Sequence, residues 1–494
     1  MINLLVLVLF TVLSSSYIIF QYFRSPLPKS RKPLPPGPKP WPIVGNILHI
    51  GKLPHISMAG FSKVHGPLIS LKLGTRTVVV ASSPAAATEI LRTQDRSLSG
   101  RIVAQASRID NLDFDRMSII FAPTCTDAWK SFRAMCRTEL FSPKAIETQS
   151  ISRERKVKEM VEYLRSRDGK VVRVGEVVFA TVINMLGNVI FSKDLMDWED
   201  KEGPRGLKSL ISTMVESAAT PNIADFYPIL AWLDPQGLRK NVAVSYKQAC
   251  VLWKNIIKER RESLASGAPA TDHRDFLDVF LSNGLDDQTI SWLTMELLIA
   301  GSDTTTSTVE WAMTELLRND QVLKKVCQEL EKEVGNNVPL TESNVSQLPY
   351  LNACVKETLR LHPPAPFLVP RRALETCEVM GYTIPKDAQV LVNVWAIGRS
   401  PSEWEDPLSF KPERFLGSSL DYKGQHFEFL PFGAGRRICP GLPLANRQVQ
   451  LILASLLRHF DWPLPDGHKL EVNEKFGIVL QKEQPLLFVP KPKQ

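Results

Sequence analysis

The stretch that decides the fold is Phe432-Gly-Ala-Gly-Arg-Arg-Ile-Cys-Pro-Gly441, in which one cysteine, Cys439, follows a run of glycines and arginines. Glycine adopts backbone conformations that a Cβ forbids, so Gly433, Gly435 and Gly441 predict a loop that curls around the sulfur. A cysteine that binds a metal does so as a thiolate, which needs backbone N–H donors directed at the sulfur and protection from water. The loop therefore predicts a buried thiolate ligand at Cys439. A glycine-rich turn around an unimportant cysteine is the competing interpretation.

The residues beside Cys439 suit the same role. Phe432 can cover the ligand, and a helix that begins near Leu444 would direct the positive end of its dipole toward the sulfur. A soft thiolate suits haem iron, to which it donates the electron density that favours O–O cleavage. Five residues match, position for position, the haem-binding loop of the cytochrome P450 family: Phe432, Gly435, Arg437, Cys439 and Gly441. The resemblance covers essentially the whole chain and implies haem b with Cys439 as its axial iron ligand.

Composition is consistent with one large enzyme domain. The chain has 494 residues, 44% apolar and 23% charged, which is enough to bury a large core. Its seven cysteines are scattered and form no CxxC pair, which favours free thiols in a reducing compartment. The net charge of +8 would suit nucleic acid, an anionic membrane or an acidic protein, and charge alone does not choose among them.

Of these three partners, the N-terminal segment favours the membrane. Residues Ile2 to Phe20 are overwhelmingly apolar and long enough to span a bilayer as a helix. Basic residues follow directly, which by the positive-inside rule places the rest of the protein on the cytoplasmic side. A cleaved signal peptide is the alternative. We therefore expect a single-pass anchor over residues 1–22, in the endoplasmic reticulum by the family resemblance, and no nucleic-acid partner.

A proline-rich segment, Pro33 to Pro42, comes next. Prolines this dense support neither a helix nor a central strand and predict a stiff, extended spacer between membrane and catalytic body. A docking motif for a proline-recognition domain is the rival interpretation. No second linker or repeat follows, so the predicted organisation is an anchor (1–22), a hinge (23–44) and one catalytic haem domain (45–494).

Hydrophobic periodicity predicts a mainly α fold with a small β-rich side. Helix-period runs cover Thr126 to Phe141, Glu154 to Ser166, Ser245 to Ser266, Ile290 to Arg318, Val322 to Val334 and Leu444 to Phe460. Strand-like runs cover Leu68 to Leu73, Thr77 to Ala81, Cys377 to Tyr382 and Gln389 to Val394.

The sequence Glu357-Thr-Leu-Arg360 is a second match to the family, with Pro412-Glu-Arg-Phe415 downstream. Residues three apart on a helix share a face, so Glu357 and Arg360 can pair. The resemblance adds Arg414 as a third member of a buried structural triad. An ordinary surface ion pair is the alternative.

The sequence Ala300-Gly-Ser-Asp-Thr-Thr305 interrupts a long helical segment. Glycine and hydroxyl residues inside a helix cost stability, and Thr or Ser can bond back to a carbonyl and open the helix locally. The resemblance implies that such a groove holds dioxygen, that Asp303 relays protons and that Thr304 assists oxygen cleavage. A solvated kink is the alternative.

The sequence Trp129-Lys-Ser-Phe-Arg133 is the fourth match. Residues four apart on a helix can reach one haem propionate together. By resemblance, the further propionate candidates are Arg101, Arg371 and Arg437. Lys130 and Arg137 share a helical surface that either helps to dock an acidic, NADPH-dependent flavin reductase or is simply solvated.

The resemblance implies an NADPH- and O2-dependent monooxygenase that hydroxylates a small hydrophobic metabolite. By position, five segments are expected to line the pocket: Ile102 to Phe121, Ile211 to Phe226, Leu293 to Thr304, Ala365 to Val369 and Phe476 to Val479. Carboxylates in two of them would pair with a protonated amine, unless they are merely solvated; these are Asp110, Asp113, Asp115 and Glu216.

Framework segments such as Cys136-Arg-Thr-Glu-Leu-Phe141 and Tyr382-Thr-Ile-Pro-Lys-Asp387 resemble plant microsomal enzymes of alkaloid biosynthesis, particularly N-methylcoclaurine hydroxylases and phenol-coupling relatives. Because Asp303 and Thr304 are both present, hydroxylation of a benzylisoquinoline-like alkaloid is the preferred prediction. Phenol coupling, rearrangement of a tropane ester and terpenoid hydroxylation remain rivals. A haem carrier or a peroxide-rearranging protein is the alternative from a different class.

Overall fold

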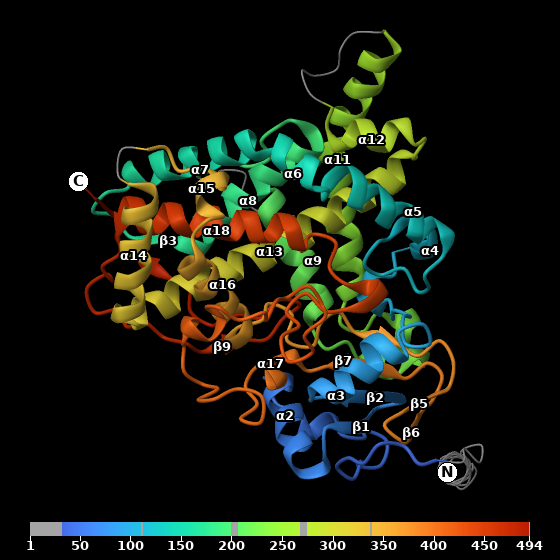
Figure 1. Cartoon of the computed structure of the whole chain (residues 1–494). Coiled ribbons are helices and arrows are strands. Elements are labelled where there is room, and N and C mark those ends of the chain that lie inside the picture. The colour runs from blue at the N-terminus through green and yellow to red at the C-terminus, as the bar shows by residue number, and fades with distance from the viewer. Residues whose placement is uncertain (1–31, 110–111, 199–205, 267–273, 336–337, 494) are drawn as a thin grey trace, which may run out of the picture.

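The computed structural model describes residues 32–109, 112–198, 206–266, 274–335 and 338–493. Helices dominate it, and a small sheet occupies one end (Figure 1). The predicted fold class, mainly α with a β-rich side, is therefore confirmed for the described residues. The predicted anchor over residues 1–22 lies outside them.

The helical part contains these α-helices: α4 (Phe114–Met117), α5 (Asp127–Met135), α6 (Pro143–Thr148), α7 (Ser150–Arg165), α8 (Val174–Phe191), α9 (Leu207–Ala219), α10 (Ile223–Phe226), α11 (Leu238–Ala265), α12 (Phe276–Ser282), α13 (Asp287–Arg318), α14 (Asp320–Val334), α15 (Glu342–Val345), α16 (Pro349–Leu361) and α18 (Leu442–His459). Three more, α2 (Pro54–His65), α3 (Pro84–Thr88) and α17 (Val394–Ile397), accompany the sheet. Short 3-10 turns include Pro412–Phe415 and Gly435–Arg437, and π-helical turns cover Glu89–Thr93 and Cys136–Leu140.

The largest sheet has the strand order β1 (Leu68–Leu73), β2 (Arg76–Ala81), β7 (Gln389–Val392), β4 (Arg371–Arg372). β1 and β2 are antiparallel, with Leu68 opposite Ala81, and β2 and β7 are parallel, with Val78 opposite Gln389. The other strands form two-stranded pairs: β3 (Val172–Arg173) with β11 (Leu487–Phe488), β5 (Cys377–Val379) with β6 (Tyr382–Ile384), β8 (Phe460–Asp461) with β12 (Lys491–Pro492), and β9 (Glu474–Lys475) with β10 (Gln481–Lys482).

Helix α13 lies at the centre of the helical part, where it packs against α8, α16 and α18. It begins where the Asp286 side chain accepts a hydrogen bond from the Thr289 amide, which caps the helix. Helix α8 packs along it. α8 is apolar on all sides and long enough to span a membrane, yet 83% of it is buried inside the protein, so it is a core helix.

Two predictions need correction. The stretch Cys377 to Tyr382 is not one strand, because Met380 and Gly381 have positive φ angles and turn the chain between β5 and β6. The proline-rich segment does not stand free where it is described. The Ser70 hydroxyl donates to the Pro35 carbonyl at 2.6 Å and its amide to the Pro36 carbonyl at 2.9 Å, so this segment lies against β1.

Candidate active site

The Cys439 loop joins the turn Gly435–Arg437 to α18, and its backbone is closed by a hydrogen bond from the Cys439 amide to the Phe432 carbonyl (3.0 Å). Gly433 and Gly435 have φ angles of +70° and +72°, in the region that favours glycine. A Cβ on Gly435 would lie 2.3 Å from the Leu91 carbonyl oxygen, so the loop excludes any larger residue there. The prediction was wrong for Gly441, whose φ of −80° suits any residue.

The Cys439 sulfur has the donors that a thiolate needs. The amides of Gly441 and Leu442, at the start of α18, donate hydrogen bonds to it. Burial raises the pKa of the Cys439 thiol, whereas these two amides and the Arg133 guanidinium lower it. Arg133 is held nearby because its Nη2 donates to the Ile438 carbonyl at 2.8 Å. Burial is the largest of these effects, so the pKa of the thiol is raised on balance, and the two amides and Arg133 are the groups that would stabilise the sulfur as an anion.

Four arginines gather beside this loop, and we call them the arginine cluster: Arg101, Arg133, Arg371 and Arg437. Burial lowers the pKa of each. The like charges of Arg371 and Arg437 lower the pKa of Arg101 further, and the pKa of Arg437 falls to about 10. So many buried cations in one place are costly without a compensating anion.

The cluster has one carboxylate and two unpaired donors. Asp95 binds Arg371 at 2.8 Å. Arg101 donates to the Val369 carbonyl at 2.6 Å, and Arg437 to the Ala122 carbonyl at 2.8 Å. Among the described residues, no group accepts a hydrogen bond from Arg101 Nε or Arg437 Nη1, although both nitrogens are buried. Such orphaned donors indicate a place for an anionic group.

The centre of α13 carries the second half of the candidate site. Ala300 is exposed there, although α13 is otherwise mostly buried. Thr304 Oγ1 donates back to the Ala300 carbonyl at 2.7 Å, which is the helix-opening bond that the sequence predicted. Burial raises the pKa of Asp303 to about 6. The helix thus offers a hydroxyl and a carboxyl that can exchange a proton near neutral pH.

Comparison with known proteins identifies the family. A model described as "Cytochrome P450" matches residues 35–489.

The chain belongs to the cytochrome P450 family.

Members of this family are monooxygenases with thiolate-ligated haem b, a small-molecule substrate and an NADPH-dependent redox partner. The residues of this P450 fit that cofactor. The Cys439 loop supplies the sulfur with its amide donors. The orphaned nitrogens of Arg101 and Arg437 suit the negative charge of the haem propionates.

Three relatives cover nearly all of this P450. A probable (S)-N-methylcoclaurine 3'-hydroxylase isozyme 2 from Coptis japonica is 51% identical over 97% of each chain. A corytuberine synthase from the same plant is 45% identical over 93% of this chain and 94% of its own. A geraniol 8-hydroxylase from Catharanthus roseus is 43% identical over 96% of each chain.

Trp129 lies differently from the prediction. Its Nε1 donates to the Ile119 carbonyl at 2.9 Å rather than pointing toward a propionate. The face of its ring instead carries the guanidiniums of Arg437, at 4.5 Å, and Arg133, at 5.5 Å. Trp129 therefore contributes to the arginine cluster by cation–π packing.

Three predicted partners form a buried network that we call the brace: Glu357, Arg360 and Arg414. Arg360 binds Glu357 through two hydrogen bonds of 2.7 Å, and Arg414 binds the same carboxylate at 3.1 Å. Glu357 and Arg360 have exposures of 0% and 1%. Further donations from Arg360 reach the Pro407 and Ser409 carbonyls, which fixes the chain ahead of the Cys439 loop.

The acidic residues offered as amine partners are mostly engaged elsewhere. Asp113 caps α4 by accepting from the Asp115 amide, and Asp115 accepts from the Thr124 hydroxyl at 3.0 Å. Glu216 is exposed on α9, and Asp110 lies outside the described residues. A protonated amine at Asp113 or Asp115 would have to share the carboxylate with these contacts.

Two important carboxylates were missed by sequence reasoning. Glu296, on α13, accepts from the Ser118 hydroxyl and from the Ile119 amide at 2.8 Å, and so holds the loop that binds Trp129. Asp95 accepts from the side chain and the amide of Arg436 as well as from Arg371. Nothing local in the sequence marks either residue, because every partner is distant along the chain.

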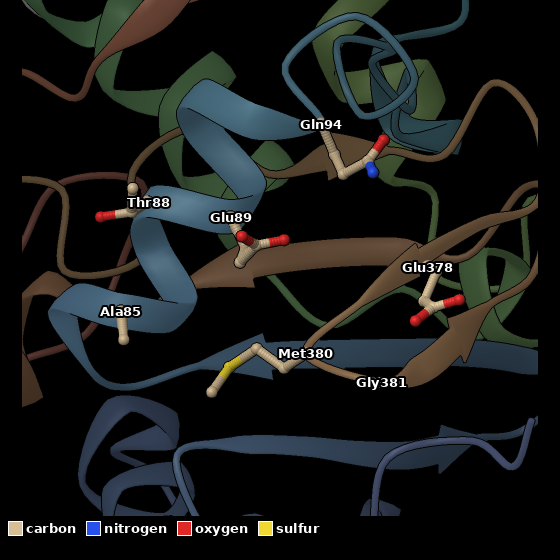
Figure 2. Close-up of a pocket in the computed structure, with 7 residues that line it drawn as sticks. All are labelled: Ala85, Thr88, Glu89, Gln94, Glu378, Met380 and Gly381. Carbon is tan, nitrogen blue, oxygen red and sulfur yellow. The ribbon is translucent and has the colours of Figure 1, made fainter.

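Figure 2 shows a surface hollow between α3, the following π-helical turn and the β5–β6 hairpin. Glu89 and Glu378 face it from opposite sides, and Met380 and Gly381 form its floor at the hairpin turn. None of the predicted site residues lines it. The hollow is therefore separate from the candidate active site.

Proposed function

We propose that Cys439 would ligate the haem iron through its sulfur and that the arginine cluster would hold the propionates. The support is the amide pair on the sulfur together with the two orphaned arginine nitrogens. Trp129 keeps Arg133 and Arg437 in place, Phe432 and Gly435 shape the loop, and Gly441 contributes its amide to the sulfur. The brace stabilises the chain behind this loop without touching substrate.

When bound, the haem supplies the activation of dioxygen. The chain supplies electron density through the Cys439 sulfur and protons through α13. Asp303, with a pKa near 6, exchanges a proton at its carboxyl oxygen, and Thr304 passes one on through Oγ1 once its bond to Ala300 is released. Thr304→Ala should therefore consume oxygen and NADPH without a matching yield of product, while haem stays bound.

The substrate proposed is a benzylisoquinoline alkaloid such as (S)-N-methylcoclaurine, which the enzyme hydroxylates on its aromatic ring. One observation carries this proposal, the 51% identity over 97% of both chains with a probable (S)-N-methylcoclaurine 3'-hydroxylase. Asp303 and Thr304 are both present, as hydroxylation requires.

The test is turnover in microsomes that contain the protein, a plant reductase and NADPH. Under labelled dioxygen, the product should gain one oxygen atom and carry the label. A product that has lost two hydrogens and gained no oxygen would instead show phenol coupling. Turnover of geraniol or a tropane ester, but not of the alkaloid, would contradict the substrate proposal.

Membrane attachment is proposed from an apolar surface among the described residues. Its members, called the apolar patch, are Trp41, Ile43, Leu48, Ile223, Ile229, Trp232 and Leu233, which are 44–80% exposed. Tyr227 joins the two parts of the patch by donating to the Ile43 carbonyl at 3.2 Å. Twenty residues separate the apolar segment Ile2 to Phe20 from the first patch residue, Trp41, in the sequence, so a membrane is the occupant that fits.

We place the protein in the endoplasmic reticulum membrane, with one span and the catalytic domain in the cytoplasm. Removal of residues 1–22 should weaken binding to vesicles. Adding Ile229→Asp and Trp232→Asp to the truncated protein should abolish the vesicle binding that is left. Unchanged binding of the truncated double variant to phosphatidylcholine vesicles would contradict a role for the apolar patch.

For electron transfer, we propose that a flavin-containing reductase docks at the surface that carries Lys130 and Arg137. Both side chains are exposed, but Lys130 already pairs with Asp127 at 2.8 Å. Arg137 is therefore the sharper probe. Arg137→Glu should raise the reductase concentration needed for half-maximal rate, and the increase should shrink at high salt.

A further inference from the structure

A buried ionic network lies where the sheet meets the helical part, and we call it the Glu474 network. The Glu474 carboxylate, on β9, accepts from His55 Nε2 at 2.9 Å, Trp395 Nε1 at 3.1 Å and Arg399 Nη2 at 3.2 Å. His362 stands 3.7 Å from the same carboxylate and binds Glu315 of α13 at 2.9 Å. The network thus ties together α2, α17, the end of α16 and, through His362 and Glu315, α13.

The network is deeply buried and firmly charged. His55 has an exposure of 0%, and the Glu474 side chain one of 8%. The nearby His362, the hydrogen bond from His55 and the charge of Arg399 hold the pKa of Glu474 well below its usual range against the opposing effect of burial. A buried carboxylate with this many donors is fixed in position, because leaving any of them unpaired is costly.

The network is joined to two walls of the proposed pocket. The His55 ring stacks on Phe476, two residues after Glu474, with ring centres 5.7 Å apart. Phe476 in turn meets the edge of Phe367 at 6.0 Å. These phenylalanines belong to two of the five segments expected to line the pocket, whereas His55 and Glu474 belong to none.

The same tail is tied to α13 close to Thr304. The Ser307 hydroxyl, three residues after Thr304, donates to the Leu480 carbonyl at 2.7 Å. The Leu480 amide donates to the Pro364 carbonyl at 2.8 Å, just before the Phe367 segment. The tail that carries Phe476 is therefore held at one end by α13 and at the other by Glu474.

We propose that Glu474 is a positioning residue for the substrate: through His55 it fixes the Phe476 ring against Phe367 and so sets the shape of one pocket wall. Glu474 itself touches no substrate. With glutamine in its place, one amide oxygen replaces the carboxylate that binds His55, Trp395 and Arg399 together, so the His55 ring is held less firmly against Phe476. The inference rests on the proposed alkaloid hydroxylation and on the segments that the sequence predicts to line its pocket, and it adds a determinant from outside those segments.

The test is a double-mutant cycle on the full-length holoenzyme with Glu474→Gln and Phe476→Leu. Dissociation constants are measured from the Soret shift with two probes, (S)-N-methylcoclaurine and the haem-binding compound 4-phenylimidazole. Each single variant should weaken binding of the alkaloid roughly 5- to 30-fold, which lies within the range of coupling between contacting residues. The double variant should be no weaker than Phe476→Leu alone. The carbon monoxide spectrum should stay unchanged.

Glu315→Gln is the matched control, since it removes a charge from the far end of the same network without touching Phe476. It should leave both dissociation constants unchanged. If Glu474→Gln gives no holoenzyme, His55→Gln takes its place in the cycle.

The inference would be overturned if a folded Glu474→Gln or His55→Gln variant bound the alkaloid as tightly as the wild type. It would also be overturned if the double variant weakened binding by the product of the two single-variant effects. If the wild type binds only 4-phenylimidazole, the proposed substrate fails. The inference is then tested by the dissociation constants of 4-phenylimidazole. It stands if both single variants change this constant and the double variant changes it no further than Phe476→Leu alone.

Discussion

The brace and the arginine cluster are both buried groups of arginines near the Cys439 loop, yet their charges are balanced differently. In the brace, Arg360 and Arg414 share the Glu357 carboxylate, and backbone carbonyls take their remaining donors. In the arginine cluster, four guanidiniums have Asp95 as the one carboxylate bound among the described residues, and buried nitrogens of Arg101 and Arg437 have no acceptor there.

The difference separates a structural network from a binding site. A group that satisfies its own charges stabilises the fold in every state of the protein. A group with surplus positive charge costs free energy until an anion arrives, and that free energy then favours binding. The two groups should therefore respond oppositely to mutation: one through folding, the other through haem retention.

The largest effect is expected in the brace. Glu357→Gln leaves two buried guanidiniums without their counter-charge, so the free energy of unfolding should fall by about 3–5 kcal/mol. Chemical denaturation and the yield of soluble protein measure this. As a control, Asp127→Asn breaks the exposed pair with Lys130 and should change neither. Normal stability of Glu357→Gln would show that the brace does not carry the fold.

A smaller and different effect is expected in the arginine cluster. Arg437→Gln removes a charge-assisted partner of the propionates, so haem loss to an acceptor protein should accelerate about 10- to 100-fold. The yield of soluble protein should stay near that of the wild type, because the lost carbonyl contacts are offset by relief of a buried charge. Arg437→Lys keeps the charge, so its rate of haem loss should lie between those of the wild type and Arg437→Gln. If Arg437→Gln lowered the yield of soluble protein but left the rate of haem loss unchanged, the arginine cluster would be a structural network like the brace.

The smallest effect is expected at Asp303, a buried group of the opposite sign. Its pKa is raised from 3.8 to about 6 by burial, so the folded state binds the proton more tightly and stability falls as the pH rises through that range. Asp303→Asn removes this dependence. It should exceed the wild type in stability by about 1–2 kcal/mol above pH 7, since solvent reaches part of the side chain, and the gain should vanish near pH 4. Thermal unfolding across this range measures it, and a pH-independent difference would contradict the raised pKa.

The sequence predicted most of what is local in the chain. β1 coincides with its predicted range, and the long helix around Ala300 and the helix after Cys439 were placed within a few residues. The hydrophobic periodicity of a segment and the turn residues that bound it are sufficient to predict such elements. Helix α8 was missed because it is apolar on every side and shows no amphipathic period.

The sequence could not reveal contacts between distant segments. The resemblance supplied the residues of the brace and the arginine cluster, but not the Trp129 bond to Ile119. Asp95, Glu296 and Glu474 carry no local pattern, since each acquires its role only when separate elements meet. Such carboxylates are visible only as buried charges in the folded protein.

The central claim, that Cys439 is the thiolate ligand of a haem held by the arginine cluster, is tested most directly by the difference spectrum of the reduced carbon monoxide complex. The wild type should show the strongly red-shifted Soret band of thiolate ligation, and Cys439→Ala should lose it. Cys136→Ala, at a buried cysteine whose pKa burial raises to about 12, should keep the band. A red-shifted band that survives in Cys439→Ala, or that disappears with Cys136→Ala instead, would contradict the account.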